Sequence, residues 1–157
     1  MIVAALAVWL ATSSVRLVPV TFEQWQQELQ AMRGRIVVVD YWATWCAPCV
    51  ARFPNMVAMA RRAPKNVTFV TMSLDDRDEP GALARVEHFL KKHDARMPNF
   101  LMNEVNPDAF DKLDLNGVPA VVIYDASGKQ RYRLTGDDPN HQFTDADVDR
   151  AVKQLTR

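Results

Sequence analysis

The chain has 157 residues, of which 48% are hydrophobic and 24% are charged, and its formal net charge at pH 7 is zero. This length is typical of a single globular domain with its own core. The balanced charge, without a basic patch or an acidic tail, argues against a nucleic-acid-binding protein and against a disordered one.

The N-terminal segment has an unusual composition. Residues 1–15 contain no charged side chain, and the stretch from Ile2 to Ala11 is almost entirely apolar. The small polar residues that follow, up to Ser14, are typical of the cleavage region of an export signal. The apolar run is shorter than the roughly 20 residues that a membrane-spanning helix needs. We therefore expect residues 1–15 to be a signal peptide or a truncated membrane anchor and residues 16–157 to be the folded domain. The alternative is a short strand or helix packed on that domain.

The folded domain opens with a short strand and a capped helix. Residues 17–20 contain a proline, which an edge strand tolerates. Thr21 and Gln24 have the spacing of a capping box. Apolar residues at helical spacing follow: Phe22, Trp25, Leu29 and Met32. The pattern predicts a helix over residues 22–33 that stops at Gly34.

A central strand and a second helix come next. Residues 35–42 form a β-rich run without alternation, which is typical of a strand covered on both faces. From Cys46 to about Ala63 the apolar residues recur at helical spacing, with Cys49 one turn after Cys46. Pro54 lies inside this helix and should kink it, because proline lacks an N–H and its ring clashes with the preceding turn.

The rest of the chain continues to alternate between strands and helices. The charged segment 75–80 suggests a solvated loop near the top of the sheet, or alternatively a loop that selects a substrate or partner. The predicted elements are strands at 66–74, 97–102, 118–124 and 130–135, and helices at 83–92, 106–113 and 143–155. This order predicts an α/β fold with a mixed sheet, in which the terminal hairpin is antiparallel.

Cys46 and Cys49 are the only cysteines in the chain and form a C-x-x-C motif. Such a pair is either a redox centre or half of a zinc site. Zinc needs about two further Cys or His ligands. His88 and His93, five positions apart, do not share a helix face well, and His141 stands far from both in sequence. We therefore expect a redox dithiol, with no metal and no cofactor.

The position of the dithiol suggests a role for each cysteine. Cys46 precedes the predicted helix, where unpaired N–H groups and the helix dipole favour a thiolate. We expect Cys46 to be open and to act as the nucleophile, and the shielded Cys49 to resolve the mixed disulfide. Asp40 ends a core strand, where burial would raise its pKa towards the range useful for proton exchange with Cys49. A paired structural acid or an exposed strand end is the alternative.

Two separate segments carry a resemblance to a known family. Residues 39–49, VDYWATWCAPC, resemble the active-site segment of the thioredoxin superfamily. Residues 116–124, NGVPAVVIY, followed by a Gly-Lys pair at 128–129, resemble the second signature of that superfamily. The resemblance extends over about residues 17–157.

The resemblance implies a substrate site on both sides of the dithiol. In this family the proline that opens the second signature is cis and faces the cysteines, and Pro119 matches it. Val118 would offer backbone groups to a bound substrate chain, Asp40 matches the buried acid, and Trp45 matches the aromatic residue before the first cysteine. The implied catalytic residues are Cys46, Cys49 and Asp40, and the implied substrate-binding residues are Trp45, Ala47, Pro48, Val118 and Pro119.

The spacing of the two motifs narrows the resemblance. Seventy positions separate Cys49 from Pro119, about one helix–strand unit more than in plain thioredoxins. Together with the Trp-Ala-Thr-Trp-Cys run and the apolar N-terminus, this spacing resembles the TlpA/ResA group of exported, usually tethered thiol-disulfide oxidoreductases. The implied fold is thioredoxin-like: a mixed central sheet flanked by helices, with an extra helix–strand insert before the cis-proline strand. Many members of that group have Asn where this chain has Asp40.

The resemblance implies the reduction of protein disulfides in a periplasmic or other extracytoplasmic setting, with electrons from a membrane donor. The Ala-Pro pair at 47–48 is similar to the Gly-Pro of reducing thioredoxins, whose potential is about −270 mV, against about −120 mV for strong oxidants. One alternative is a cytoplasmic thioredoxin-like reductase with a structural N-terminus. The other is a non-catalytic interaction or chaperone module on the same fold.

Overall fold

The computed structural model describes residues 14–136, 138 and 140–157. The export signal or anchor expected over residues 1–15 falls almost entirely on residues 1–13, which lie outside the described part. Among the described residues, no helix combines the length and the apolar character that crossing a bilayer requires.

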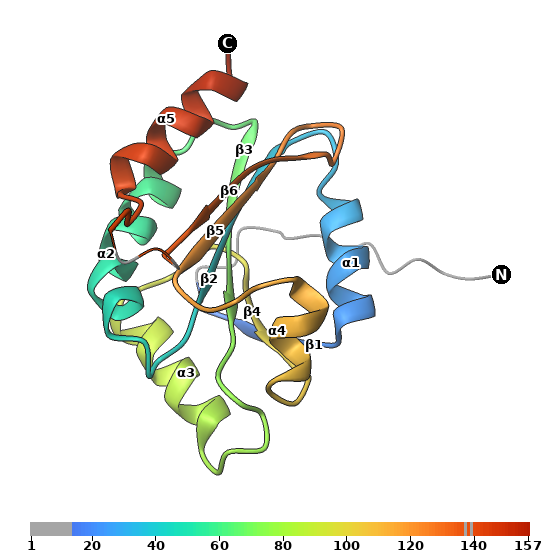
Figure 1. The fold of residues 1–157 in the computed structure, drawn as a ribbon, viewed down its shortest axis with the longest axis vertical. Coiled ribbons are helices and arrows are strands. Elements are labelled where there is room, and N and C mark those ends of the chain that lie inside the picture. The colour runs from blue at the N-terminus through green and yellow to red at the C-terminus, as the bar shows by residue number, and fades with distance from the viewer. Residues whose placement is uncertain (1–13, 137, 139) are drawn as a thin grey trace, which may run out of the picture.

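The described residues form one sheet with helices on both faces. The elements are β1 (Leu17–Val20), α1 (Phe22–Ala31), β2 (Ile36–Trp42), α2 (Ala47–Arg62), β3 (Val67–Ser73), α3 (Ala82–Lys92), β4 (Asn99–Met102), α4 (Asp108–Leu113), β5 (Ala120–Tyr124), β6 (Gln130–Thr135) and α5 (Asp145–Leu155). Helices α1 and α4 cover one face, and α2, α3 and α5 cover the other (Figure 1). The predicted α/β fold, a mixed sheet flanked by helices, is confirmed.

The strand order is β1-β4-β3-β2-β5-β6. The pairs β1–β4, β4–β3 and β3–β2 are parallel, whereas β2–β5 and β5–β6 are antiparallel. β1 and β6 are therefore the edges, with Pro19 on one and Arg131 and Arg133 on the other. The segment between β3 and β5, where the sequence predicts an insert, forms α3, β4 and α4.

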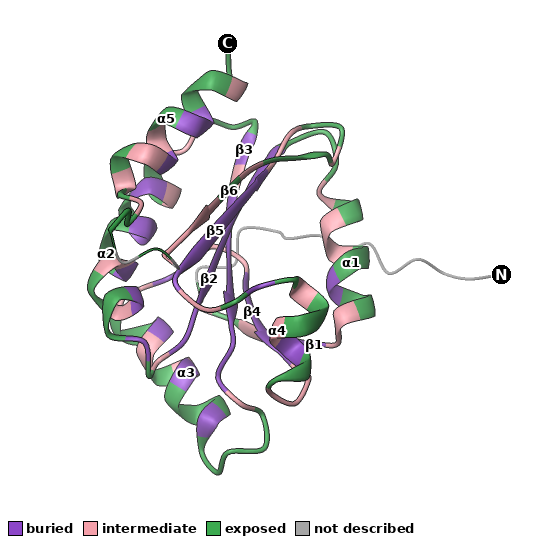
Figure 2. Ribbon diagram, viewed as in Figure 1, coloured by how far each residue is buried: buried purple, intermediate pink, exposed green. Residues whose placement is uncertain are grey.

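Strand β2 lies at the centre and is buried along all seven of its residues (Figure 2). Successive side chains of a strand point to opposite faces. Val37 and Val39 belong to the core beneath α1 and α4, whereas Ile36 and Val38 belong to the core beneath α2 and α5. By this alternation Asp40 faces α2 and α5, on the same side as the cysteine-bearing helix.

The local signals at α1 behave as the sequence predicts. Thr21 and Gln24 form both hydrogen bonds of the capping box, so two otherwise unpaired N–H groups are satisfied. The helix ends at Ala31, two residues earlier than expected, and Gly34 has a φ of +95°. Only glycine adopts this left-handed conformation without steric cost, which explains why the helix gives way to β2 at this point.

Candidate active site

Cys46 and Cys49 are joined by a disulfide at the start of α2. Their Cα atoms are 5.2 Å apart. Cys46 is the N-cap, and its Sγ accepts a hydrogen bond from the backbone N–H of Cys49 at 3.3 Å. Pro48 lies in the first turn, where its missing N–H removes no intrahelical hydrogen bond. In the reduced protein the same N–H and the positive end of the helix would stabilise a thiolate on Cys46.

The two cysteines do not differ in exposure as the sequence suggests. Cys46 is 5% exposed and Cys49 is 2% exposed, so the expectation of an open Cys46 is wrong for this disulfide-bonded state. The physical reason is that both belong to an apolar cluster with Trp42 and Phe53. Their positions still differ, because Cys46 caps the helix and Cys49 lies inside its first turn.

The surface beside the disulfide is formed by its sequence neighbours. Trp45 is 56% exposed, and Ala47 and Pro48 are also exposed. A large apolar side chain directly before a helix N-terminus, with little packing of its own, offers contact area to another molecule.

The second signature approaches the dithiol from β5. Ala120 pairs with Tyr41, so the buried Pro119, one residue earlier, lies at the level of the end of β2. Val118 packs against the apolar cluster that contains both cysteines. The Val118–Pro119 peptide bond is cis, as the resemblance implies. The structure thus brings the two motifs to the same end of the sheet.

Asp40 lies within β2, two residues before its end, rather than at the strand end as the sequence suggests. It is 3% exposed, and its Oδ1 makes no hydrogen bond to any described residue. Burial raises the pKa of Asp40 to about 7; the Arg52 guanidinium opposes this rise, and the Asp145 carboxylate adds to it. Arg52 lies 3.7 Å from Asp40 and one turn after Cys49 on α2, so Cys49 shares the helix face that looks towards Asp40.

The loop before Cys46 is held by a residue that the sequence analysis did not single out. Asp75 has a side chain that is 0% exposed, although it begins the charged segment 75–80. Its Oδ2 accepts hydrogen bonds from the N–H of Thr44 at 2.9 Å and from the hydroxyl of Ser73 at 2.7 Å, and the hydroxyl of Thr44 donates to its Oδ1. Arg85 donates to the Thr44 hydroxyl at 3.0 Å and lies 3.7 Å from Asp75.

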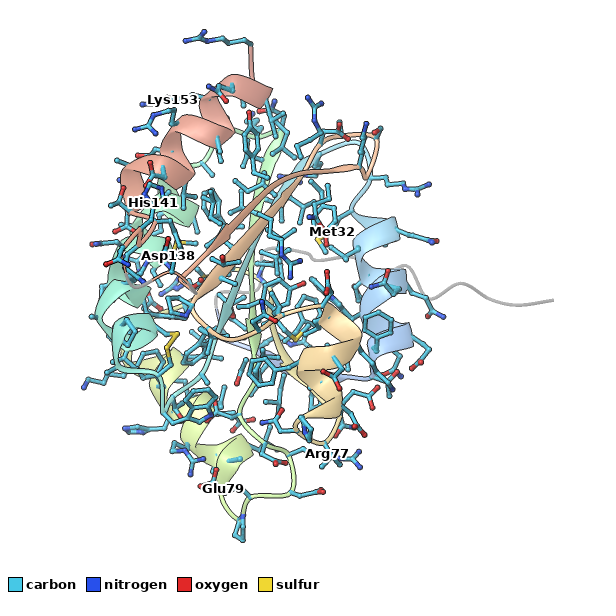
Figure 3. The ribbon with its side chains drawn as sticks, viewed as in Figure 1. Met32, Arg77, Glu79, Asp138, His141 and Lys153 are labelled. Carbon is cyan, nitrogen blue, oxygen red and sulfur yellow. A yellow bond between two sulfur atoms is a disulfide. The ribbon has the colours of Figure 1, made fainter. Side chains whose placement is uncertain are left out.

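The interpretation of segment 75–80 as solvated is therefore wrong for Asp75, although Arg77 and Glu79 are exposed, with Glu79 beside α3 and Arg77 on the side of α4 (Figure 3). One signal could have identified Asp75. It follows the apolar strand β3, whose carboxyl end lies beside that of β2 in a parallel pair. An acid at this position meets the loop that leaves β2.

We expect Asp75→Ala to lower the free energy of unfolding by about 2–4 kcal/mol, because it leaves the Thr44 N–H and the Ser73 hydroxyl without their acceptor. It should also remove the protection of the Thr44 amide against hydrogen exchange. Urea denaturation and amide exchange measure the two effects. Asp78→Ala is the matched control, since the Asp78 side chain is 63% exposed. Equal effects of the two substitutions would contradict this role of Asp75.

Within the part of the chain that the structure describes, no group of three or more His, Cys, Asp or Glu side chains could hold a metal ion. The chemistry that the arrangement offers is that of two sulfur atoms, a helix N-terminus and a buried carboxyl group.

Comparison with known proteins agrees with this geometry. The family model described as Thioredoxin matches residues 16–91. The thiol-disulfide oxidoreductase ResA of Oceanobacillus iheyensis is 28% identical over 103 residues, which cover 65% of this chain and 50% of that protein. The thiol:disulfide interchange protein HelX of Rhodobacter capsulatus is 26% identical over 127 residues, which cover 78% and 65%. The chain thus spans about half to two thirds of the length of these curated relatives.

Solved structures give the same fold. A thiol:disulfide interchange protein of the thioredoxin family from Chlorobium tepidum matches with a TM-score of 0.62 and 26% identity, over 80% of this chain and 83% of that one. A secreted disulfide oxidoreductase of Mycobacterium tuberculosis matches with a TM-score of 0.61 and 23% identity, over 80% and 86%. The thioredoxin-like fold that the sequence predicts is confirmed.

Proposed function

The chain is a TlpA/ResA-like protein of the thioredoxin superfamily, and we propose that it is a thiol-disulfide oxidoreductase that reduces protein disulfides. The observation that carries this proposal is the Cys46–Cys49 pair at the N-terminus of α2, with the buried Asp40 on the neighbouring strand. A helix N-terminus lowers the pKa of a thiol, and a buried acid that titrates near pH 7 can exchange protons with one.

In the first proposed step, the Cys46 thiolate attacks one sulfur of the substrate disulfide. The substrate S–S bond breaks as the bond between Cys46 and the substrate forms, and the departing substrate sulfur takes up a proton. The place of Cys46 at the helix cap supports its role as nucleophile, because the Cys49 N–H already points at its sulfur.

In the second step, Cys49 attacks the sulfur of Cys46. The mixed disulfide breaks, the second substrate sulfur leaves as a thiol, and the Cys46–Cys49 disulfide forms. Two electrons and two protons pass from the dithiol to the substrate in one cycle. The short separation of the two Cα atoms, 5.2 Å, supports this resolving role of Cys49.

Asp40 is the proposed base for the second step. Cys49 must lose its proton before it attacks, and a carboxyl group with a pKa of about 7 is partly ionised at neutral pH and can accept it. When the reaction runs in the oxidising direction, the protonated Asp40 returns the proton. The burial of both groups supports this exchange, because it limits competition from water.

The proposed substrate-binding surface consists of Trp45, Ala47 and Pro48 on one side and of Val118 and Pro119 on the other. The first three are exposed beside the disulfide, and Val118 packs against the cysteine cluster. An extended substrate segment that pairs with the Val118 backbone would bring its disulfide to Cys46, in the manner of a strand added to a sheet edge.

We extend the proposal to an extracytoplasmic setting, in which a membrane thiol donor reduces the Cys46–Cys49 disulfide again. The apolar residues 1–15 support an export signal or tether ahead of the domain 16–157. Cell fractionation, with a check for cleavage near Ser13 or Ser14, tests this setting. Recovery of the uncleaved protein from the cytoplasm would favour the alternative of a cytoplasmic reductase.

The direction of electron flow follows from the reduction potential of the dithiol. We expect the purified protein, equilibrated with defined thiol-disulfide buffers, to have a potential near that of thioredoxins, about −270 mV. The fraction of reduced Cys46 and Cys49 is read by thiol trapping and mass spectrometry. A potential above about −150 mV would contradict the reductase and favour an oxidant of protein thiols.

A further inference from the structure

Arg52 connects three parts of the molecule behind the dithiol. Its Nη1 lies 3.7 Å from Oδ1 of Asp40 on β2. Its Nε and Nη2 donate hydrogen bonds to Oδ1 of Asp145, at the start of α5, at 3.3 and 3.2 Å. Its guanidinium group stacks over the ring of Phe143, 4.4 Å from the ring centroid. The side chain is only 15% exposed, so one largely buried cation serves two carboxylates from distant parts of the chain.

The two carboxylates hold Arg52 differently. Asp145 is 31% exposed, lies in the first turn of α5, and also accepts a hydrogen bond from Asn55 at 2.7 Å. Water, the helix dipole and Asn55 therefore stabilise its negative charge. Asp40 has none of these partners, and neither its Oδ1 nor Arg52 Nη1 makes a hydrogen bond to the described residues. The tight pair is Arg52–Asp145, and Asp40 interacts with the same Arg52 cation at a longer distance, without a hydrogen bond.

We propose that Arg52 is a positioning residue that shares its charge between Asp145 and Asp40, and that the first turn of α5 thereby tunes the protonation of the carboxyl group behind the dithiol. The effect on disulfide exchange rests on the proposed function, whereas the coupling between the three charges does not.

This arrangement lets Asp40 change its protonation state at low cost. When Asp40 is protonated, Arg52 keeps Asp145 as its counter-ion, so no unpaired cation is left in the interior. When Asp40 loses its proton, Arg52 is close enough to stabilise the new charge. An isolated Arg–Asp pair would resist this change, because protonation of the acid would leave the buried guanidinium without an anion.

The charges that face Asp40 come from two elements. In the described part of the chain, α2 supplies Arg52 and, in the reduced protein, the titratable thiol of Cys49, while α5 supplies Asp145. The flanking strands place Thr71 and Val121 beside Asp40, and neither carries a charge. The two charged neighbours act in opposite directions, because the Arg52 cation lowers the pKa of Asp40 and the Asp145 carboxylate raises it.

The test uses two substitutions that should shift the titration midpoint of Asp40 in opposite directions. Arg52→Met keeps the apolar stem and removes the charge, so the titration midpoint of Asp40 should rise by about 1–3 pH units. Asp145→Asn frees more of the Arg52 charge for Asp40, and the midpoint should fall by a smaller amount, about half a unit. The midpoint is read from the carboxyl carbon signal of Asp40 by NMR in the oxidised full-length protein, where the cysteines do not titrate.

Asp149→Asn is the matched control. Asp149 lies on the same helix and pairs with the exposed Arg62 at 3.1 Å, so this substitution removes an equal charge without touching Arg52. The Asp40 midpoint should stay within about 0.2 unit of the unsubstituted protein. If Arg52→Met does not fold, Phe143→Leu takes its place, because it removes the ring that holds the guanidinium while keeping the charge, and it should also shift the midpoint.

Three results would overturn the proposal. They are an unchanged midpoint in Asp145→Asn, shifts of the same sign in Arg52→Met and Asp145→Asn, or a control shift as large as that of Asp145→Asn. The pH profile of disulfide exchange is recorded separately. If the NMR midpoints move as expected but the protein reduces no disulfide, the charge coupling stands and the proposed function fails.

Discussion

Cys46→Ser is expected to lower the rate of reduction of a protein disulfide by at least about a thousandfold, because the remaining Cys49 lies buried inside the first turn of α2 and does not cap the helix. Cys49→Ser should stop turnover equally well but at a later stage. Its Cys46 can still attack, and nothing remains to resolve the product. We therefore expect Cys49→Ser to accumulate a covalent complex with the substrate, visible by mass spectrometry and lost on addition of a reductant.

The comparison between the two variants decides the roles of the cysteines. The double variant Cys46→Ser/Cys49→Ser is the control for non-covalent binding and should give no covalent complex. A trapped complex with Cys46→Ser, but none with Cys49→Ser, would reverse the assignment of nucleophile and resolving residue. Undiminished biological function of Cys46→Ser in cells would favour the non-catalytic interaction module over the enzyme.

Asp40→Asn is expected to raise the free energy of unfolding above pH 7 while slowing the reaction. The pKa of Asp40 is raised from its ordinary value of 3.8 to about 7 in the folded protein. Below pH 4 the carboxyl group is neutral in both the folded and the unfolded state, so it contributes nothing. Between pH 4 and 7 the unfolded chain releases this proton and the folded protein retains it, so the folded protein loses stability as the pH rises.

Above pH 7 the loss is complete and amounts to about 3–5 kcal/mol. The Asp40→Asn substitution removes this loss of stability, although burial of the asparagine amide offsets part of the gain. We therefore expect the free energy of unfolding to increase by about 2–4 kcal/mol at pH 8 and to change little at pH 4. Urea denaturation at the two pH values measures this difference. Equal effects of Asp40→Asn at pH 4 and pH 8 would show that the carboxyl group does not titrate in this range.

The kinetic effect of Asp40→Asn has the opposite sign. Loss of a general base should slow disulfide exchange at pH 8 by about 100-fold and remove the inflection of the rate near pH 7. Rates measured between pH 5 and pH 9 test this, and the stability gain provides an internal control that the variant is folded. An unchanged pH profile would make Asp40 a structural acid only.

Much of the fold can be predicted from local sequence patterns, because the residues in those patterns themselves stabilise the helix or strand that they predict. The Thr21–Gln24 capping box forms both of its hydrogen bonds, and the β-rich run before the cysteines is the fully buried β2. The cysteine motif also specifies its own geometry, since two cysteines three positions apart at the start of a helix lie close enough to form a disulfide.

The ion-pair and hydrogen-bond partners of the charged residues could not be predicted from local sequence patterns. Arg52 lies on the same helix as Arg61 and Arg62, whose side chains are about 60% exposed, and nothing in the local sequence sets it apart. The difference arises only when α5, some ninety residues later, brings Asp145 to it. Asp75 was likewise hidden in a charged run, because its burial depends on Thr44 from a different strand end.

The two edge strands of the sheet, β1 and β6, affect how the protein can contact its proposed substrates. A reductase of protein disulfides meets chains that are partly unfolded and rich in unpaired backbone groups, and an open sheet edge would template their aggregation. Pro19 interrupts the donor pattern of β1, and Arg131 and Arg133 place positive charges along β6. Both edge strands are therefore poor surfaces for the addition of an unrelated strand. The proposed substrate-binding surface around Trp45 and Val118 then remains the site where a substrate chain can bind.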